Sequence, residues 1–213
     1  MARRSYKQAW SLARALDAVG DRWTLLVIRD LLLGPRRYGQ LQACLPGIGT
    51  NLLADRLKSM EKIGLVRRRP VDAGHQWELT EIGLGLEPAL MAMIRWAMAT
   101  RLPAHGDELS RPEWDLIAMK ALFDPHRYTG APGRFRLVLN GLAGILEIVG
   151  EALHVRQEDG GAARATIEMD ATTGWQLATA RAGFEDALAD GRLKVSGDTG
   201  AARRLLEAFR LGK

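Results

Sequence analysis

Apolar positions in the first hundred residues recur at helical spacing. Four of them, within residues 9–16, lie on one side of a helix. In residues 21–33, apolar side chains fall nearly all round the helical period, which predicts a second, buried helix with Asp21 as its N-cap. A short third helix is predicted for residues 38–45 and a fourth for residues 50–63, with a Pro-Gly turn between them.

The pattern then changes to alternation, which is typical of strands. Residues 65–70 and 76–79 flank a turn-rich segment, so they predict a β-hairpin with three arginines on its first arm. A long helix is predicted for residues 80–100, with Thr80 as its cap and a kink at Pro88. This order of helices and basic hairpin is typical of a winged helix-turn-helix, whose second paired helix enters the DNA major groove.

A Pro- and Gly-containing break at residues 103–107 predicts a linker between an N-terminal domain, residues 1–101, and a C-terminal domain, residues 112–213. The second domain begins with a helix that ends near residue 123, and helices follow in residues 172–180, 184–190 and after Asp198. Its alternating segments are residues 135–139, 145–149, 153–155, 165–169 and 193–195. Short glycine-rich loops predict antiparallel pairing, and the fold class is α+β, with an antiparallel sheet packed against helices.

Charge is divided unevenly between the two halves. Residues 1–101 contain 16 Lys and Arg against 9 Asp and Glu, whereas residues 102–213 contain 14 against 16. A basic, arginine-rich half favours nucleic acid as a partner, because the guanidinium fork suits phosphate and guanine; solvated helix faces are the alternative. The apolar runs are shorter than the roughly 20 residues of a membrane span, and no secretory signal pattern is present, so we expect a cytoplasmic protein.

Candidate catalytic chemistry is sparse. Cys44 is the one cysteine, which excludes an intramolecular disulfide and a cysteine-cluster zinc site. In the C-terminal half, His105, His126 and His154 are isolated, and this half has neither a glycine-rich phosphate loop nor a nucleophile elbow. We therefore expect no enzyme activity, no metal and no cofactor.

Several motifs of the N-terminal half resemble the HxlR family of bacterial transcriptional regulators. They are the strings GDRWTLLVIRDL at residues 20–31, GPRRY at 34–38, LPGI at 45–48, LADRL at 53–57, GLV at 64–66 and LTEIG at 79–83. The resemblance implies a homodimer, paired mainly through the first and last helices of this half, that binds double-stranded DNA at an inverted-repeat operator. Redox-sensing members carry a cysteine near the start of the first helix, where this chain has Trp10, so we expect no thiolate sensing there and interpret Cys44 as a core thiol.

The candidate DNA contacts lie on the helix pair and the hairpin. Asn51 is suited to a bidentate contact with adenine, although it and Thr50 could simply begin the helix. Asp55 would accept from a cytosine amine or pair with a neighbouring arginine. The full set is Arg36, Arg37, Tyr38, Thr50, Asn51, Asp55, Arg56, Lys58, Arg67, Arg69 and His75. For residues 36–38 the alternative is a solvated patch, and for His75 it is a simple turn residue.

The C-terminal half resembles the sterol carrier protein type of lipid-binding domain. The resemblance rests on the order of strands and helices and on a Gly-Arg-Leu-Lys-Val-Ser-Gly-Asp stretch at residues 191–198, before a closing amphipathic helix. It implies an apolar cavity between sheet and helices, although each lining residue would equally suit an ordinary core. The candidate lining residues are Trp175, Leu177, Phe184, Leu188, Leu205 and Phe209.

Two functions are consistent with these patterns. The first is a dimeric DNA-binding transcriptional regulator whose C-terminal domain senses a small hydrophobic ligand or adds a dimer contact. The second is a lipid or small-molecule carrier that uses its basic half on anionic surfaces. A helix-turn-helix with a hairpin, in place of one basic amphipathic helix, favours the regulator.

Overall fold

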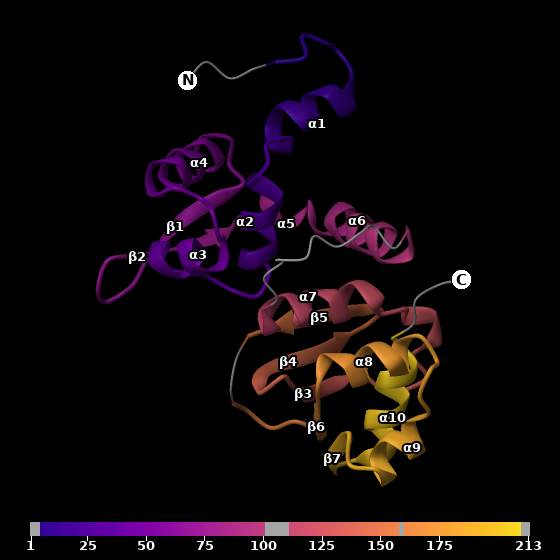
Figure 1. Cartoon of the computed structure of the whole chain (residues 1–213). Helices are drawn as coiled ribbons and strands as arrows, with labels where there is room; N and C mark the ends of the chain where they lie inside the picture. Colours follow the sequence, from indigo (N-terminus) through magenta and orange to yellow (C-terminus); the bar gives the residue numbers. More distant parts are fainter. Residues whose placement is uncertain (1–4, 101–110, 158–159, 210–213) are drawn as a thin grey trace. The chain divides into compact units, whose positions relative to one another are not determined.

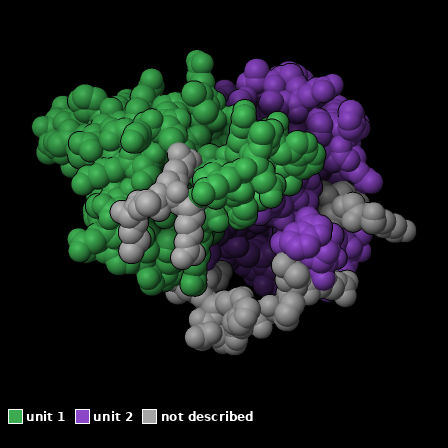
Figure 2. All heavy atoms as spheres, turned by 90° about the horizontal axis from the view of Figure 1, so that it is seen from above, with its two compact units in different colours: residues 1–90 green, residues 91–213 purple. Residues whose placement is uncertain are grey.

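The computed structural model describes residues 5–100, 111–157 and 160–209, and it divides into two compact units, residues 1–90 and residues 91–213 (Figures 1 and 2). The predicted linker, residues 103–107, lies outside the described residues. The domain limits at residues 101 and 112 therefore stay a prediction.

Unit 1 consists of short helices and a two-stranded sheet, in the order of a winged helix-turn-helix (Figure 1). The helices are α1 (Ser11–Val19), α2 (Thr24–Leu31), α3 (Tyr38–Cys44), α4 (Thr50–Lys62) and α5 (Glu81–Leu84). The strands are β1 (Val66–Pro70) and β2 (His75–Leu79), which pair antiparallel. A further helix, α6 (Glu87–Thr100), starts in unit 1 and continues into unit 2. The order of elements confirms the fold class predicted for this half.

The core of unit 1 is built from the apolar stripes of α2, α3 and α4. Ile28, Leu41 and Leu53 have no exposed surface, and Cys44 is also buried, at 3% exposure. Helix α1 behaves differently, because its predicted stripe is largely exposed. Leu12 is 58% exposed, although it belongs to the same stripe as the buried Ala13. The apolar side of α1 therefore leaves a surface that unit 1 does not cover.

The predicted long helix at residues 80–100 is divided into α5 and α6. Thr80 caps α5 as predicted, since its side chain accepts a hydrogen bond from the Gly83 amide. The interruption falls at residues 85–86, and Pro88 takes the second position of α6, where its missing N–H costs little. Residues 81–100 have a mean hydropathy of 1.2, enough for a membrane span by length and composition alone. This stretch is interrupted between α5 and α6 and contains three charged residues, Glu81, Glu87 and Arg95.

Unit 2 combines a five-stranded sheet with helices. The strands are β3 (Gly133–Leu139), β4 (Leu142–Val149), β5 (Ala152–Arg156), β6 (Ala165–Met169) and β7 (Leu193–Gly197). The helices are α7 (Pro112–Leu122), the short 3-10 helix η1 (Pro125–Arg127), α8 (Ala171–Ala178), α9 (Phe184–Ala189) and α10 (Thr199–Glu207). These elements match the α+β prediction for the C-terminal half.

The sheet is mixed, which corrects the antiparallel expectation. Its strand order is β5-β4-β3-β6-β7, and β3 pairs parallel with β6 while the other three pairings are antiparallel. After the β3-β4-β5 hairpins the chain returns to the free side of β3, so β6 runs in the same direction as β3. Phe135, Leu137 and Ile167 lie at the centre of the buried face and are at most 1% exposed.

Candidate nucleic-acid interface

Helix α4 presents one buried side and one exposed side. Leu53, Leu57 and Met60 are at most 1% exposed and hold the helix to the core. Asn51 and Asp55, about half a turn away from this stripe, are exposed, as is Lys58. The predicted division of this helix into a core side and a polar side is therefore present, and the polar side carries one amide, one carboxylate and cationic groups.

The start of α4 is fixed by Tyr38, the first residue of α3. The Tyr38 hydroxyl donates to the Thr50 carbonyl oxygen at 2.6 Å, and Gly49 occupies the N-cap. Gly47 in the preceding turn has a φ of 84°, which favours glycine. The Tyr38 hydroxyl proton is thus used inside the protein, and Tyr38 positions the first turn of α4.

Arg56 is engaged with the N-terminus of α2. Its Nη1 atom lies 2.8 Å from Asp21 Oδ2, and its buried Nε atom has no hydrogen-bond partner. The Asp21 carboxylate also accepts from the backbone amides of Trp23, the N-cap residue of α2, and Thr24, the first residue of α2, at 3.0 and 3.1 Å. One carboxylate therefore caps α2 and anchors α4, so Arg56 has a structural role in addition to the predicted DNA contact.

Arg36 is the one member of the predicted contact set that is buried, and its DNA contact stays a prediction. Its side chain is buried, at 9% exposure, and Nε donates to the Asp30 carbonyl oxygen at 2.9 Å. Its backbone pairs with Trp77 in both directions, at 2.9 and 2.8 Å, and so adds a short third segment to the hairpin. The neighbouring Arg37 is exposed, and its Nη1 donates to the Ala73 carbonyl oxygen of the hairpin loop at 2.6 Å.

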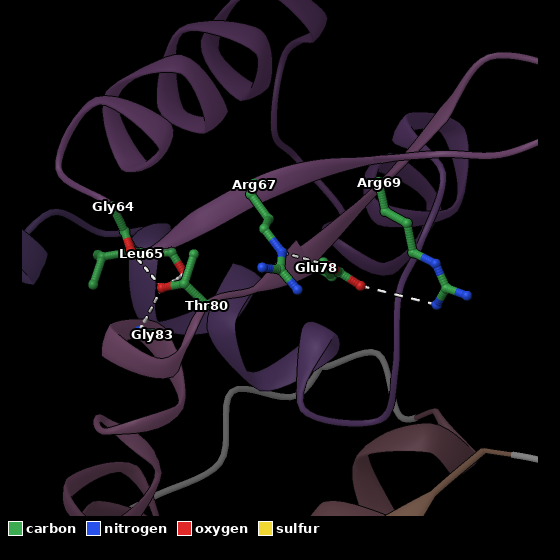
Figure 3. A network of polar contacts seen from close by, with 7 residues as sticks. All are labelled: Gly64, Leu65, Arg67, Arg69, Glu78, Thr80 and Gly83. Atoms are coloured by element: carbon green, nitrogen blue, oxygen red, sulfur yellow. Dashed lines mark hydrogen bonds and ion pairs between the residues drawn. The ribbon is translucent and has the colours of Figure 1, made fainter.

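The two hairpin arginines predicted to share a face do so, and both lie beside Glu78 (Figure 3). Arg67 Nε is 2.6 Å from Glu78 Oε1, and Arg69 Nη1 is 3.9 Å from Oε2. The arginine side chains are 68% and 57% exposed, so solvent screens these pairs. Two cations and one anion leave one net positive charge on this face of the hairpin.

Arg68 points to the other face of the strand and joins three elements. Its guanidinium lies 5.0 Å from the Trp77 ring centroid, and its Nε is 3.3 Å from Glu61 Oε1 on α4. The exposed ring of His75 meets Trp77 edge-on, with centroids 5.5 Å apart. Arg68 thus holds the hairpin against α4, a role for which the only sequence signal is that strand alternation places Arg68 on the opposite face from Arg67 and Arg69.

The base of the hairpin is closed by Thr80 (Figure 3). Its hydroxyl hydrogen-bonds the Gly64 carbonyl oxygen at the end of α4, and its backbone amide donates to the Leu65 carbonyl oxygen at 3.1 Å. Gly83 approaches so closely that a Cβ there would lie 2.1 Å from the Leu65 oxygen. A hydroxyl and a glycine together therefore set where the hairpin leaves α4.

Leu52 is exposed on α4 and was absent from the predicted set. Its side chain is 43% exposed, beside Asn51 in the first helical turn. The helical period places Leu52 away from the buried stripe of Leu53, Leu57 and Met60. It is left out of the predicted DNA contacts because its side chain is apolar.

The six candidate ligand residues of unit 2 differ in their environment. Leu205 and Phe209 are core residues at 1% exposure, and the Phe209 ring packs 5.7 Å from that of Phe123. Trp175 is 37% exposed. Phe184, Leu177 and Leu188 are half-buried, and Arg203 lies 5.2 Å from the Phe184 ring. The lining role of all six stays a prediction.

Carboxylates in unit 2 serve the ends of helices. Asp170 and Asp198 cap α8 and α10, and backbone hydrogen bonds from Thr173 and Ala201 lower the pKa of each. Burial raises the pKa of Asp115, although a hydrogen bond from Asn140 opposes the shift. Among the described residues, no group of three or more His, Cys, Asp or Glu side chains could hold a metal ion.

Two family models match this chain over separate segments. Residues 18–104 match the HxlR-like helix-turn-helix family, and residues 125–210 match the SCP-2 sterol transfer family. Both resemblances inferred from the sequence are therefore confirmed.

The similar proteins are bacterial regulators. The chain is 39% identical over 114 residues to the uncharacterized HTH-type transcriptional regulator Rv3095 of Mycobacterium tuberculosis. This alignment covers 52% of this chain and 66% of Rv3095. It is 34% identical over 88 residues to the HTH-type transcriptional regulator YodB of Bacillus subtilis, in an alignment that covers 39% of this chain and 77% of YodB. The crystal structure of quinone-bound YodB superposes with a TM-score of 0.38 and 33% identity over 41% of this chain and 96% of that one. The chain thus spans just under two thirds of the mycobacterial relative.

Proposed function

This chain belongs to the HxlR-like helix-turn-helix family of transcriptional regulators, and we propose that it regulates transcription as a cytoplasmic homodimer on an inverted-repeat operator in double-stranded DNA. The observation that carries the proposal is the exposed polar side of α4, whose opposite side is fixed in the core. A helix held in this way can enter the major groove without losing its own packing.

We assign direct readout to the first turns of α4 and phosphate contacts to its surroundings. Asn51 is exposed and has the donor and acceptor that adenine requires in the major groove. Asp55 would accept from a cytosine amine. The phosphate contacts are proposed for Arg37, Lys58, Arg67, Arg69 and, at the hairpin tip, His75.

Glu78 reduces the positive charge of the proposed hairpin contact but leaves both arginines accessible. Arg67 and Arg69 share this carboxylate in the free protein, and each has more than half of its side chain in solvent. A phosphate can therefore approach either guanidinium without first opening a buried ion pair. The net contribution to affinity is smaller than two unpaired arginines would give.

The dimer is proposed from exposed apolar side chains. On and before α1, Trp10 and Leu12 are 69% and 58% exposed, and on α5 and α6, Ile82 and Trp96 are 66% and 61% exposed. Large apolar groups gathered on helix surfaces favour a protein partner, and a second copy would bury them while placing two α4 helices about one DNA turn, roughly 34–36 Å, apart.

For unit 2 we propose control by a small hydrophobic ligand, or an added dimer contact. The match to the SCP-2 sterol transfer family supports ligand binding. A ligand that binds one dimer arrangement better would change the spacing of the two α4 helices and so the operator affinity. The proposal includes no enzyme activity and no cofactor. A carrier function on anionic surfaces is the second candidate, and the SCP-2 match is the observation that favours it.

Fluorescence anisotropy separates these functions. The purified protein is titrated with the duplex upstream of its own gene and with a scrambled duplex, each across a salt series. A regulator should prefer the native duplex by about a thousandfold, with both affinities falling as salt rises. Asn51→Ala should lose this preference, and Asn51→Ala binding to anionic vesicles should be unchanged. Equal binding of wild type to both duplexes, together with vesicle binding, would support the carrier instead.

A further inference from the structure

Leu52 differs from the other exposed large apolar residues of unit 1. Within residues 5–90, these residues otherwise fall before or on α1 and on α5, the elements proposed for the dimer. Leu52 lies on α4, with Asn51, Asp55 and Ser59 as its exposed neighbours. At 43% exposure it is therefore an apolar group inside the polar surface proposed for DNA.

The position of Leu52 directs it toward base edges. It follows Asn51 in the first turn of α4, and N-terminal residues of a recognition helix are those that reach the bases. Successive residues are about 100° apart around a helix and about 1.5 Å apart along it, so the Leu52 side chain leaves the same turn about a quarter turn away from Asn51, on the flank of its exposed side. If Asn51 contacts one base, this displacement along and around the helix would bring Leu52 to the edge of an adjacent base pair.

The chemistry of the major groove leaves one good partner for an apolar side chain. Base edges present hydrogen-bond donors and acceptors there, and the C5-methyl group of thymine is the apolar exception. Leu52 against a polar edge would remove water from that edge without replacing its hydrogen bonds, which is unfavourable. Leu52 against a methyl group buries two apolar surfaces at once.

We propose that Leu52 reads a thymine C5-methyl group next to the adenine contacted by Asn51, so that each half-site of the operator contains an adjacent pair of A·T base pairs. This inference rests on the proposed function and adds the base class to it. Leu52 is then a specificity-determining residue whose contact requires no charge.

Selection from a random duplex library tests this assignment and identifies the operator sequence at the same time. Wild type, Leu52→Ala and Asn51→Ala are each used to enrich bound sequences. We expect wild type to select adenine and thymine at two neighbouring positions, Leu52→Ala to lose the thymine preference alone, and Asn51→Ala to lose the adenine preference alone. Leu52→Ala leaves the buried stripe of α4 intact, so its fold is expected to be retained; circular dichroism checks this.

Deoxyuridine substitution then isolates the methyl group, because it deletes that group and keeps the base pair. For wild type, replacing the selected thymine in one half-site should weaken binding about fourfold, the value of one buried methyl-sized group. Leu52→Ala should show no such loss, whereas Asn51→Ala should retain it. Specific binding in which deoxyuridine has no effect, or has the same effect on Leu52→Ala, would refute the inference and leave the proposed function standing. Binding without any sequence preference would overturn both.

Discussion

Gly83 is the position where a single methyl group should disturb unit 1 most. In an ordinary helix, Gly→Ala is stabilising by about 1 kcal/mol because it reduces the freedom of the unfolded chain. Here the new Cβ would lie 2.1 Å from the Leu65 carbonyl oxygen and 3.1 Å from Leu79 Cδ2. The oxygen belongs to the backbone and accepts the Thr80 amide at 3.1 Å, so it cannot move without loss.

These terms give the sign and size of the effect. Overpacking costs about 1–3 kcal/mol and a weakened hydrogen bond about 1 kcal/mol, while helix propensity returns about 1 kcal/mol. We therefore expect Gly83→Ala to lower the free energy of unfolding of unit 1 by about 2 kcal/mol. For a unit of this size, the melting temperature should fall by roughly 10 °C.

Gly39 is the matched control. It lies in α3, and a Cβ there would meet nothing within 4 Å. Gly39→Ala should therefore be neutral or stabilising by up to about 1 kcal/mol. Calorimetry of the full chain, with hydrogen exchange of peptides from β1–β2 and from β3–β4, separates the two units. Faster exchange in β1–β2 alone is the expected result for Gly83→Ala. Wild-type exchange and melting in this variant would show that the close approach to Leu65 does not constrain the hairpin.

Three further predictions concern the hairpin and unit 2. Arg68→Gln should destabilise unit 1 by about 1 kcal/mol, because it removes the contacts with Trp77 and Glu61. Arg67→Gln should leave the stability unchanged and reduce the salt slope of DNA binding by about one. Urea unfolding measures the first effect and fluorescence anisotropy the second, and equal stability losses in the two variants would contradict the prediction. Asn140→Ala and Asn140→Gly both remove the hydrogen bonds to Asp115 and from the Ala171 amide. Asn140→Ala should lower the stability of unit 2 more, because Asn140 has a φ of 50°, which glycine adopts more easily than alanine. Equal losses would show that the turn conformation contributes nothing. Hydrogen bonds to the Asp170 carboxylate lower its pKa below the ordinary 3.8, so its contribution to the stability of unit 2 is complete above that value and is lost as the pH falls through the lowered pKa. In Asp170→Asn, the stability of unit 2 should therefore depend less on pH in the acid range. A pH dependence equal to that of wild type would refute this.

Local patterns predicted most of the elements. The stripe of Leu53 and Leu57 and the turn before Thr50 located α4, and alternation located the hairpin with Arg67 and Arg69 on one face. These features depend on residues close together in the chain, so helical and strand periods are sufficient to find them.

Other features depend on residues that are distant in sequence. Burial of Arg36 arises from backbone pairing with Trp77, and the Asp21–Arg56 pair joins α2 to α4. The sequence does not show that Arg36 pairs with Trp77 or that Asp21 pairs with Arg56, because this half of the chain contains several other arginines and carboxylates. The direction of β6 was missed for the same reason: alternation identifies a strand but does not state which neighbour it pairs with or in which direction.

The parallel pairing of β3 with β6 has a consequence for the growing polypeptide. The strands β3, β4 and β5 can form hairpins as soon as they are synthesised, but the second edge of β3 has no partner until residues 165–169 are available. During that interval Phe135, Leu137 and Leu139 lack the β6 side of their core, and an open apolar edge is a template for association with other chains. Fragments ending before β6 should therefore aggregate, and expression of unit 2 requires the chain to continue through β6 and the helices that cover it.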